Sequence, residues 1–351
     1  MVEERAQPPV VEERAQSPVV EERVQPPVVE ERVQPPVVEE RVQPPVVEER
    51  ARRASRDQDV APVRAFWERL GLPGLVDVHA HFLPPPIEKA VYAVFDAAGP
   101  KIGRPWPIRY RAPVEERVAL LRAMGVRAFP TLPYAHKPGV AGFLNDWARD
   151  FAREVPESLW SGTFFPEPEA GAYVADLVGA GIAVFKVHVQ VGEFHLDDRL
   201  LDPVWGVLED AGTPVVVHAG SGPVANAFTG PEPMRAVLER FPRLAVVVAH
   251  MGAPEYDGFF ALAERFERVR LDTTMVFTDF FDEAAGRFPD HLVPALRDLG
   301  GKILLGTDFP TIPYPYAHQL ESLERLGLGD DWLRAVCWEN GAALFGVGSS
   351  R

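Results

Sequence analysis

The sequence predicts a (β/α)8 barrel, or TIM barrel, preceded by a disordered N-terminal repeat tail. Eight apolar, β-rich runs follow one another, amphipathic stretches of helical spacing lie between them, and the alternation continues over about 290 residues. Strands that alternate with helices indicate βαβ units and a parallel sheet. Eight such units agree with a closed barrel, whose typical length is about 250 residues.

The first segment, residues 1–59, differs in composition from the rest. Val-Glu-Glu-Arg recurs every nine residues from Val2 to Val47, mostly followed by Gln-Pro-Pro-Val. Paired prolines remove backbone donors and favour extended geometry before them. We therefore predict a disordered, solvated repeat tail, a linker over residues 51–59, and a barrel domain over residues 60–351. The repeat leaves open whether the tail is inert or binds a partner that reads proline.

The eight runs have the length and the uniform apolar character of strands buried on both faces. They are 75–82, 126–134, 159–167, 182–191, 214–220, 244–252, 269–277 and 302–310. Helical spacing marks 114–124, 143–153, 201–211, 234–241, 259–266 and 292–299. An open doubly wound sheet is the alternative, but no Gly-x-Gly-x-x-Gly follows the first run.

The longest gap between runs is rich in proline and aromatic residues. We predict that residues 83–111 form an insertion that caps the mouth of the barrel. Trp106 and Tyr110 are candidate aromatic walls for a substrate.

Charge and composition exclude several classes of protein. The formal net charge of −15 argues against a nucleic-acid partner, which would require a basic surface. No run of 18 apolar residues predicts a membrane span, and no secretory signal is visible. The single cysteine, Cys337, excludes an internal disulfide framework and suits the cytoplasm. A homo-oligomer stays open.

Polar side chains end four of the runs: His79 and His81, His218, His250, and Asp308. Residues two apart on a strand share a face, so His79 and His81 can reach one ion from a single strand. In these barrels the C-terminal ends of the strands carry the site. Imidazole and carboxylate ligands suit a divalent transition metal, Zn²⁺ first, then Mn²⁺, Fe²⁺ or Co²⁺.

The order of these residues along the chain resembles the amidohydrolase superfamily of metal-dependent enzymes. Val-Asp-Val-His79-Ala-His81-Phe, His250-Met-Gly and Gly306-Thr-Asp308-Phe-Pro resemble its amidohydrolase-related branch, as does the closing 339–346 segment. The resemblance covers residues 75–346. It implies one divalent metal held by His79, His81, His218 and Asp308. It also implies that His250 and Asp308 act as the catalytic acid–base residues.

Weaker candidates surround this set. Lys186 and His188 lie in the fourth run, and with Phe82 and His136 they are candidate substrate-binding residues. Two-metal members of the superfamily carry a carboxylated lysine on strand four, which Lys186 could be; the alternative is a buried ammonium paired with a carboxylate. The glutamate that serves adenosine deaminases after the strand-five histidine is Ser221 here, which argues against a purine deaminase.

The resemblance leaves two reactions open. We expect a hydrolase in which metal-activated water attacks an amide, ester or lactone carbonyl of a small molecule. The alternative is a non-oxidative decarboxylase of an aromatic or dienoic acid. Ala219-Gly-Ser221 replaces a Pro-Trp-Asp found after the histidine in some decarboxylases, which favours hydrolysis. A barrel that only binds a ligand is a third reading, disfavoured because no expected site residue is missing.

Overall fold

The computed structural model describes residues 46–348, and their side chains from residue 58. The repeat tail, up to residue 45, lies outside the described residues, so its predicted disorder stays a prediction. The segment predicted as a linker, 51–59, instead lies within helix α1, Val46–Arg69. The physical reason is its composition: residues 46–61 contain neither glycine nor proline and are rich in Ala, Arg and Glu, which favour helix.

Parallel strands follow one another around a ring in chain order. They are β1 Leu75–Val76, β2 Val126–Pro130, β3 Ser158–Leu159, β4 Ser161–Thr163, β5 Val184–His188, β6 Val215–His218, β7 Val246–Val248, β8 Val269–Asp272 and β9 Ile303–Leu304. Strands β1 to β3 form one sheet and β4 to β9 another. Only Trp160 separates β3 from β4, so these two strands belong to one predicted run.

The ring closes between its first and last runs. Ala80 pairs with Phe309 in a parallel bridge beyond β1 and β9. The Val78 amide donates to the Leu305 carbonyl at 2.8 Å, and the His81 amide donates to the Phe309 carbonyl at 2.7 Å. The predicted (β/α)8 barrel is therefore confirmed, with strands shorter than the apolar runs because the tips of the runs turn into loops.

Side-chain alternation divides each strand between the barrel interior and the helices outside. Val76, Val184, Val216, Val247 and Leu304 pack together in one buried cluster. Their neighbours on β6 and β7, such as Val215, Val217, Val246 and Val248, join the larger cluster that contains the helices. Because residues two apart share a face, the side chains that follow Val184 and Val216, including Lys186 and His218, belong to the interior face.

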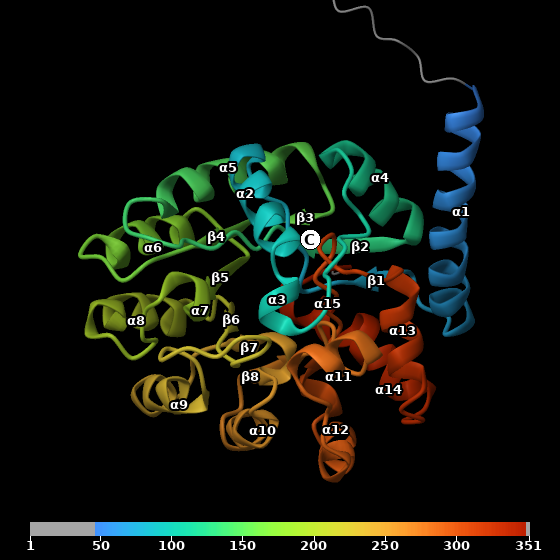
Figure 1. The fold of residues 1–351 in the computed structure, drawn as a ribbon. Helices are drawn as coiled ribbons and strands as arrows, with labels where there is room; N and C mark the ends of the chain where they lie inside the picture. The colour runs from blue at the N-terminus through green and yellow to red at the C-terminus, as the bar shows by residue number, and fades with distance from the viewer. Residues whose placement is uncertain (1–45, 349–351) are drawn as a thin grey trace, which may run out of the picture. The chain divides into compact units, whose positions relative to one another are not determined.

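The helices surround the strands (Figure 1). They are α4 Val114–Met124, α5 Ala141–Glu154, α6 Ala170–Gly179, α7 Val189–Gly192, α8 Asp202–Ala211, α9 Pro231–Arg240, α10 Tyr256–Arg265, α11 Asp279–Ala285, α12 Val293–Asp298, α13 Tyr316–Glu324, α14 Asp330–Arg334 and α15 Asn340–Phe345. The six stretches of helical spacing all correspond to helices in this set. The six stretches do not include α6, α7, α11, α13 or α14; α6, for example, is a mixture of small and apolar residues with weak periodicity.

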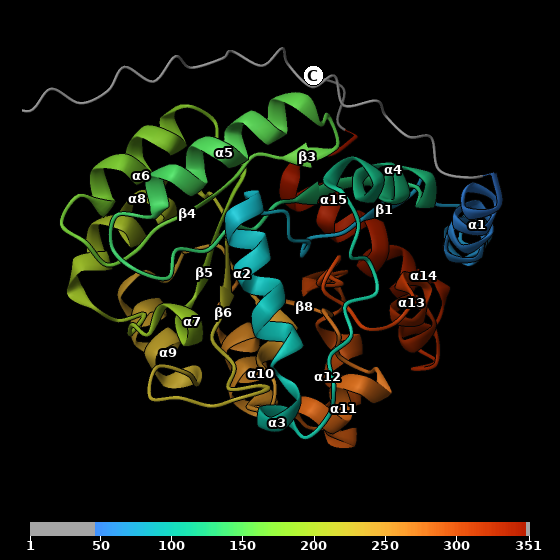
Figure 2. The same ribbon diagram turned by 45° about the horizontal axis from the view of Figure 1, so that its top comes forward.

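The long first connection crosses the mouth of the barrel, as the sequence predicted. It contains α2, Pro85–Asp96, and α3, Gly99–Ile102. Helix α2 lies over the centre of the ring in both views of the ribbon, and α3 follows it (Figures 1 and 2). Among the described residues, no helix combines the length and the apolar character needed to cross a membrane.

Candidate metal centre and active site

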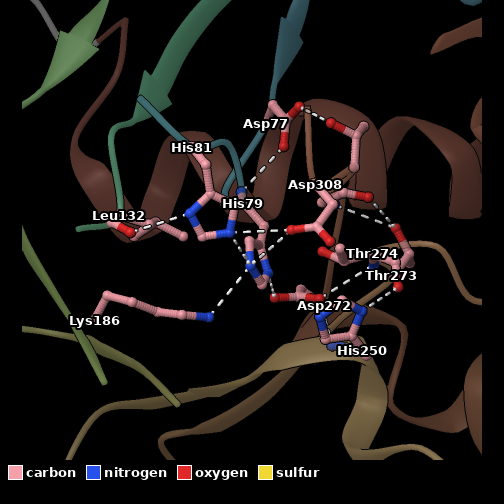
Figure 3. A network of polar contacts seen from close by, with 12 residues as sticks. Asp77, His79, His81, Leu132, Lys186, His250, Asp272, Thr273, Thr274 and Asp308 are labelled. Atoms are coloured by element: carbon pink, nitrogen blue, oxygen red, sulfur yellow. Dashed lines mark hydrogen bonds and ion pairs between the residues drawn. The ribbon is translucent and has the colours of Figure 1, made fainter. Parts of the chain in front are cut away.

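Three of the four predicted metal ligands converge at the C-terminal mouth of the barrel. Nε2 of His79 and Nε2 of His81 lie 3.2 Å apart. Oδ1 of Asp308 lies 3.0 Å from the second of these nitrogens and 3.5 Å from the first. The three side chains point toward one another in Figure 3 although they come from opposite ends of the chain. Each offers one ligand atom, and these atoms all lie within 4.8 Å of one another.

Hydrogen bonds on the far sides of both rings fix which nitrogen faces the centre. Nδ1 of His81 lies 3.1 Å from the carbonyl oxygen of Leu132, which can only accept a proton. Nδ1 of His79 lies 2.9 Å from Oδ2 of the Asp272 carboxylate. Each Nδ1 therefore carries the hydrogen, and in neutral rings both Nε2 atoms present lone pairs.

Two lone pairs and a carboxylate oxygen directed at one point repel one another unless a cation lies between them. Such an N, N, O donor set, with both imidazoles oriented from behind by acceptors, is the arrangement found around protein-bound transition metals. The residues therefore fit a divalent metal ion at this point.

The loops that carry the ligands have an unusual backbone. Asp308 has φ +71°, His250 has φ +53° and Leu132 has φ +38°, all in the left-handed region that disfavours residues other than glycine. Gly306 allows the close approach of β8 and β1, because a Cβ there would lie 2.2 Å from Oγ1 of Thr274 and 2.9 Å from Cβ of His79. Strain of this kind collects at functional sites.

Asp272 links three parts of the site, and sequence reasoning missed it. Besides its bond to His79, its Oδ1 accepts the backbone N–H of His250 at 2.8 Å and that of Thr274 at 3.1 Å. It is fully buried. The available signal was a single carboxylate within the seventh apolar run, 269–277, where Asp272 ends strand β8 as His218 ends β6.

His250 lies beside the cluster, with its ring centroid 5.2 Å from that of His79. Its Nδ1 donates to the carbonyl oxygen of Thr274 at 3.0 Å, since that oxygen can only accept. The neutral ring therefore keeps a lone pair on Nε2. Burial lowers the pKa of His250, so this neutral form is favoured. His250 also lines the central cavity.

His218, the fourth predicted ligand, lies near the cluster but outside it. Its Nε2 lies 3.2 Å from the carbonyl oxygen of Gly222, and its ring is 4.8 Å from that of His250. It stacks against His188 with a centroid distance of 3.9 Å and an angle of 11°. Nδ1 of His188 is buried and has no hydrogen-bond partner. Both rings line the cavity.

Lys186 enters from β5 and approaches the cluster from the side opposite Asp308 (Figure 3). Its Nζ lies 3.2 Å from Nε2 of His79, and the side chain is fully buried. Burial lowers its pKa to about 8, against the attraction of the Asp272 and Asp308 carboxylates. The ammonium thus has two carboxylates in its surroundings, but its hydrogen-bond neighbour is an imidazole.

Electrostatics follow from this packing. Burial first, and the Lys186 charge second, lower the pKa of His79 to about 3. Burial acts to raise the pKa of Asp272, but the hydrogen bonds that its carboxylate accepts from His79 and Thr274 outweigh it and lower that pKa to about 2. Burial acts to raise the pKa of Asp308, but the adjacent rings of His81 and His79 outweigh it and lower that pKa. Neutral imidazoles and ionised carboxylates are the forms that bind metals.

Asp77 is fully buried two residues before His79, and the chain bends at Val78 between them, so it does not share the face of the two histidines as strand alternation would predict. Its Oδ2 accepts from the hydroxyls of Thr307 at 2.6 Å and Tyr316 at 3.0 Å. Its Oδ1 accepts the backbone N–H of His79 at 3.0 Å. Asp77 therefore braces the strand that carries the ligands.

A cavity of about 730 Å³ opens above the cluster. Its lining includes the cluster, His250, Lys186, His188 and the exposed His136. Two predicted contacts require correction. Phe82 is fully buried against Phe129 and Phe151, because it follows His81 and so points to the opposite side of the strand. Tyr110 is buried too and accepts from the Tyr316 amide, whereas Trp106 does line the cavity.

A closed barrel with clustered imidazoles and a carboxylate at its C-terminal mouth is the arrangement of metal-dependent barrel enzymes. The family model described as amidohydrolase matches residues 76–347, and the chain belongs to this family. It is therefore an enzyme of a group of metal-dependent hydrolases and decarboxylases, and the family uses a divalent metal ion. No curated protein matches the sequence.

Solved structures share the fold at low sequence identity. An uncharacterised TIM-barrel protein of Bordetella bronchiseptica is 21% identical, with a TM-score of 0.62 over 79% of this chain and 100% of its own. A 5-carboxyvanillate decarboxylase of Novosphingobium aromaticivorans, complexed with manganese and a nitrobenzoic acid, is 15% identical, with a TM-score of 0.53 over 79% and 97%. A 2-pyrone-4,6-dicarboxylic acid hydrolase assigned in Pseudomonas putida is 17% identical, with a TM-score of 0.52 over 79% and 99%.

Proposed function

We propose that this protein is a metal-dependent hydrolase of small molecules that carry an uncharged ester, amide or lactone. The observation that carries the proposal is the lining of the cavity above the His79–His81–Asp308 cluster. Apart from the cluster, His250 and Lys186, much of this lining is apolar and includes Ile87, Val91, Val94, Val191 and Val224. An apolar lining around one polar cluster suits an uncharged carbonyl compound better than a substrate that carries further charge.

The cation is held, in this proposal, by His79, His81 and Asp308, with His218 as the fourth ligand. Zn²⁺ suits two or three neutral imidazoles and one carboxylate best, and Mn²⁺, Fe²⁺ and Co²⁺ follow. Two observations support this. The Nε2 atoms of His79 and His81 face the same point, and the Nδ1 atom of each ring donates a hydrogen bond to an acceptor on its far side. His218 supports it less directly, through its place beside His250.

When bound, a divalent cation supplies Lewis acidity, which polarises a carbonyl and acidifies a water molecule. Side chains of the protein then transfer the protons. The Asp308 carboxylate has a second oxygen, Oδ2, that can take a proton from the attacking water and pass it to the leaving group. Nε2 of His250 can accept a hydrogen bond from that water, because its Nδ1 is committed to Thr274. These roles make Asp308 and His250 the proposed catalytic residues.

Decarboxylation is the second candidate, and Lys186 is the observation that favours it. A buried ammonium 3.2 Å from Nε2 of His79 could bind the carboxylate of an aromatic or dienoic acid. One structural neighbour is a decarboxylase of an aromatic acid. In this reading His188 and His136 would contact the rest of the substrate.

The deciding experiment combines elemental analysis of the purified protein with two substrate panels. Neutral esters, amides and lactones are followed for acid release, and aromatic and dienoic acids for CO₂ release. The proposal predicts bound transition metal and turnover in the first panel. If only the acids are turned over, with CO₂ as product, the protein is a decarboxylase and the hydrolase proposal is wrong. If the protein neither contains nor takes up a transition metal, both enzyme proposals fail and a non-catalytic, ligand-binding barrel is the conclusion.

A further inference from the structure

Helix α2 turns an apolar face toward the cavity instead of toward the protein core. No residue of α2 is buried. Yet its apolar side chains lie at spacings of three and four, on one face, and line the cavity: Ile87, Ala90, Val91, Val94 and Phe95. Val94 is 67% exposed. A helix normally buries such a face against its own protein. A ligand bound in the cavity would bury this one.

Polar contacts hold α2 in place, together with the packing of Phe95 against Trp106 at its C-terminal end. The buried guanidinium of Arg117, on α4, pairs with Glu88 at 2.6 Å and donates to the hydroxyl of Tyr92 at 3.2 Å. Arg111 pairs with Asp96 at 2.7 Å. The three partners on α2 are spaced four residues apart and form one stripe of the helix. Because this stripe anchors the helix, the apolar stripe beside it stays free to contact a ligand.

A second part of the cavity wall is largely apolar. The segments that follow β5 and β6 line it with Val191, Pro223, Val224 and Ala225, beside the polar Gln190, Glu193 and Asn226. Among the described residues, the large apolar side chains that are strongly exposed are Val94, Phe143, Val191, Leu200 and Val224. Three of these five belong to the cavity, on both walls. Exposed apolar surface concentrated in one hollow indicates a binding site.

We propose that the α2 face and the wall at 191 and 223–225 form a subsite for the uncharged hydrocarbon group of the substrate. The proposal rests on the function proposed above, since it places the scissile carbonyl at the His79–His81–Asp308 cluster in the same cavity. A volume of about 730 Å³ lies within the range of small-molecule sites, roughly 300–1,000 Å³. The substrate class is thus a neutral ester, amide or lactone with a hydrocarbon chain or ring.

Turnover of a homologous series tests the subsite. The zinc-loaded full chain is assayed with the p-nitrophenyl esters of acetic, butyric, hexanoic and octanoic acid. We expect kcat/KM to rise with chain length, by up to about fourfold per methylene group, because each buried CH₂ contributes roughly 0.8 kcal/mol. The near-isosteric changes Val91→Thr and Val94→Thr should flatten this rise. Ala93→Ser, on the exposed side of the same helix, should leave it unchanged.

Binding of amides separates this proposal from the hydrolase proposal. Hexanamide, octanamide and decanamide are titrated calorimetrically into the wild type and the Val94→Thr variant. Affinity that rises with chain length in the wild type and less in the variant supports the subsite, even if none of the esters is turned over. Hydrolysis without any dependence on chain length would overturn the subsite and leave the hydrolase. A slope that Val91→Thr and Val94→Thr do not change would also overturn it.

Discussion

The ammonium nitrogen of Lys186 lies 3.2 Å from Nε2 of His79, the nitrogen that also faces His81 and Asp308. A positive charge in this position opposes a second cation on the same side of the cluster. The arrangement therefore favours a single metal ion and an unmodified lysine over a two-metal site with a carboxylated one.

Replacing Lys186 by methionine tests this view. We expect the Lys186→Met variant to keep about one transition-metal ion per chain, because the change removes a repulsive charge and no ligand. Elemental analysis of the wild type, the variant and the exposed control Lys137→Met measures the stoichiometry. A wild type with two ions, reduced to one or none in the variant, would establish the lysine as a ligand.

Asp272 should govern metal affinity without touching the metal. The Asp272→Asn variant weakens the acceptor that orients His79, and outer partners of this kind typically contribute 10- to 100-fold to affinity. We expect a loss of that size in competition titrations against a chelator. The exposed Asp290→Asn serves as control. Unchanged affinity in Asp272→Asn would reduce the carboxylate to a purely structural role.

Substitution of Asp308 by asparagine should lower turnover strongly and metal binding only slightly. In the proposed hydrolase, Asp308→Asn keeps a ligand oxygen but cannot take a proton, so kcat should fall by about 10²–10⁴-fold. Much of the metal should remain bound. Rates and metal content measured on the same preparation check this. An Asn variant with nearly normal kcat would show that another group moves the proton.

Gly306 lies where the run that carries Asp308 passes close to His79 and Thr274. A methyl group there would collide with Cβ of His79 at 2.9 Å, so Gly306→Ala should destabilise the protein by about 1–3 kcal/mol. Metal affinity should fall with it. Gly301→Ala is the matched control, since nothing lies within 4 Å of a Cβ at that position. Equal melting temperatures for the two variants would contradict the crowding argument.

Cys337 should be inert in the folded protein. It is fully buried, and burial raises the pKa of its thiol, so the reactive thiolate is scarce at neutral pH. Ellman's reagent should react with one thiol per chain only after denaturation in guanidinium. Rapid reaction of the native protein at pH 8 would show that this part of the core opens.

Much of the fold could be predicted because it depends on local patterns. Uniform apolar runs such as 214–220 specify strands buried on both faces, and periodic stretches such as 114–124 specify helices. The insertion at 83–111 was visible as an excess of length. A linker was predicted over 51–59 where the structure has helix α1, because the prolines that favour extended geometry in the repeat are absent from residues 46–61.

The sequence alone determined which chemical groups stand at the ends of the apolar runs, and therefore that imidazoles and a carboxylate would gather at one mouth of a barrel. Only the tertiary structure decided their orientation. It turned both Nε2 atoms inward by placing Leu132 and Asp272 behind the rings, brought Lys186 to His79, directed Nε2 of His218 at Gly222, and buried Phe82. The reason is physical: a ring orientation depends on hydrogen-bond partners that lie far away in the sequence, and no local pattern records them.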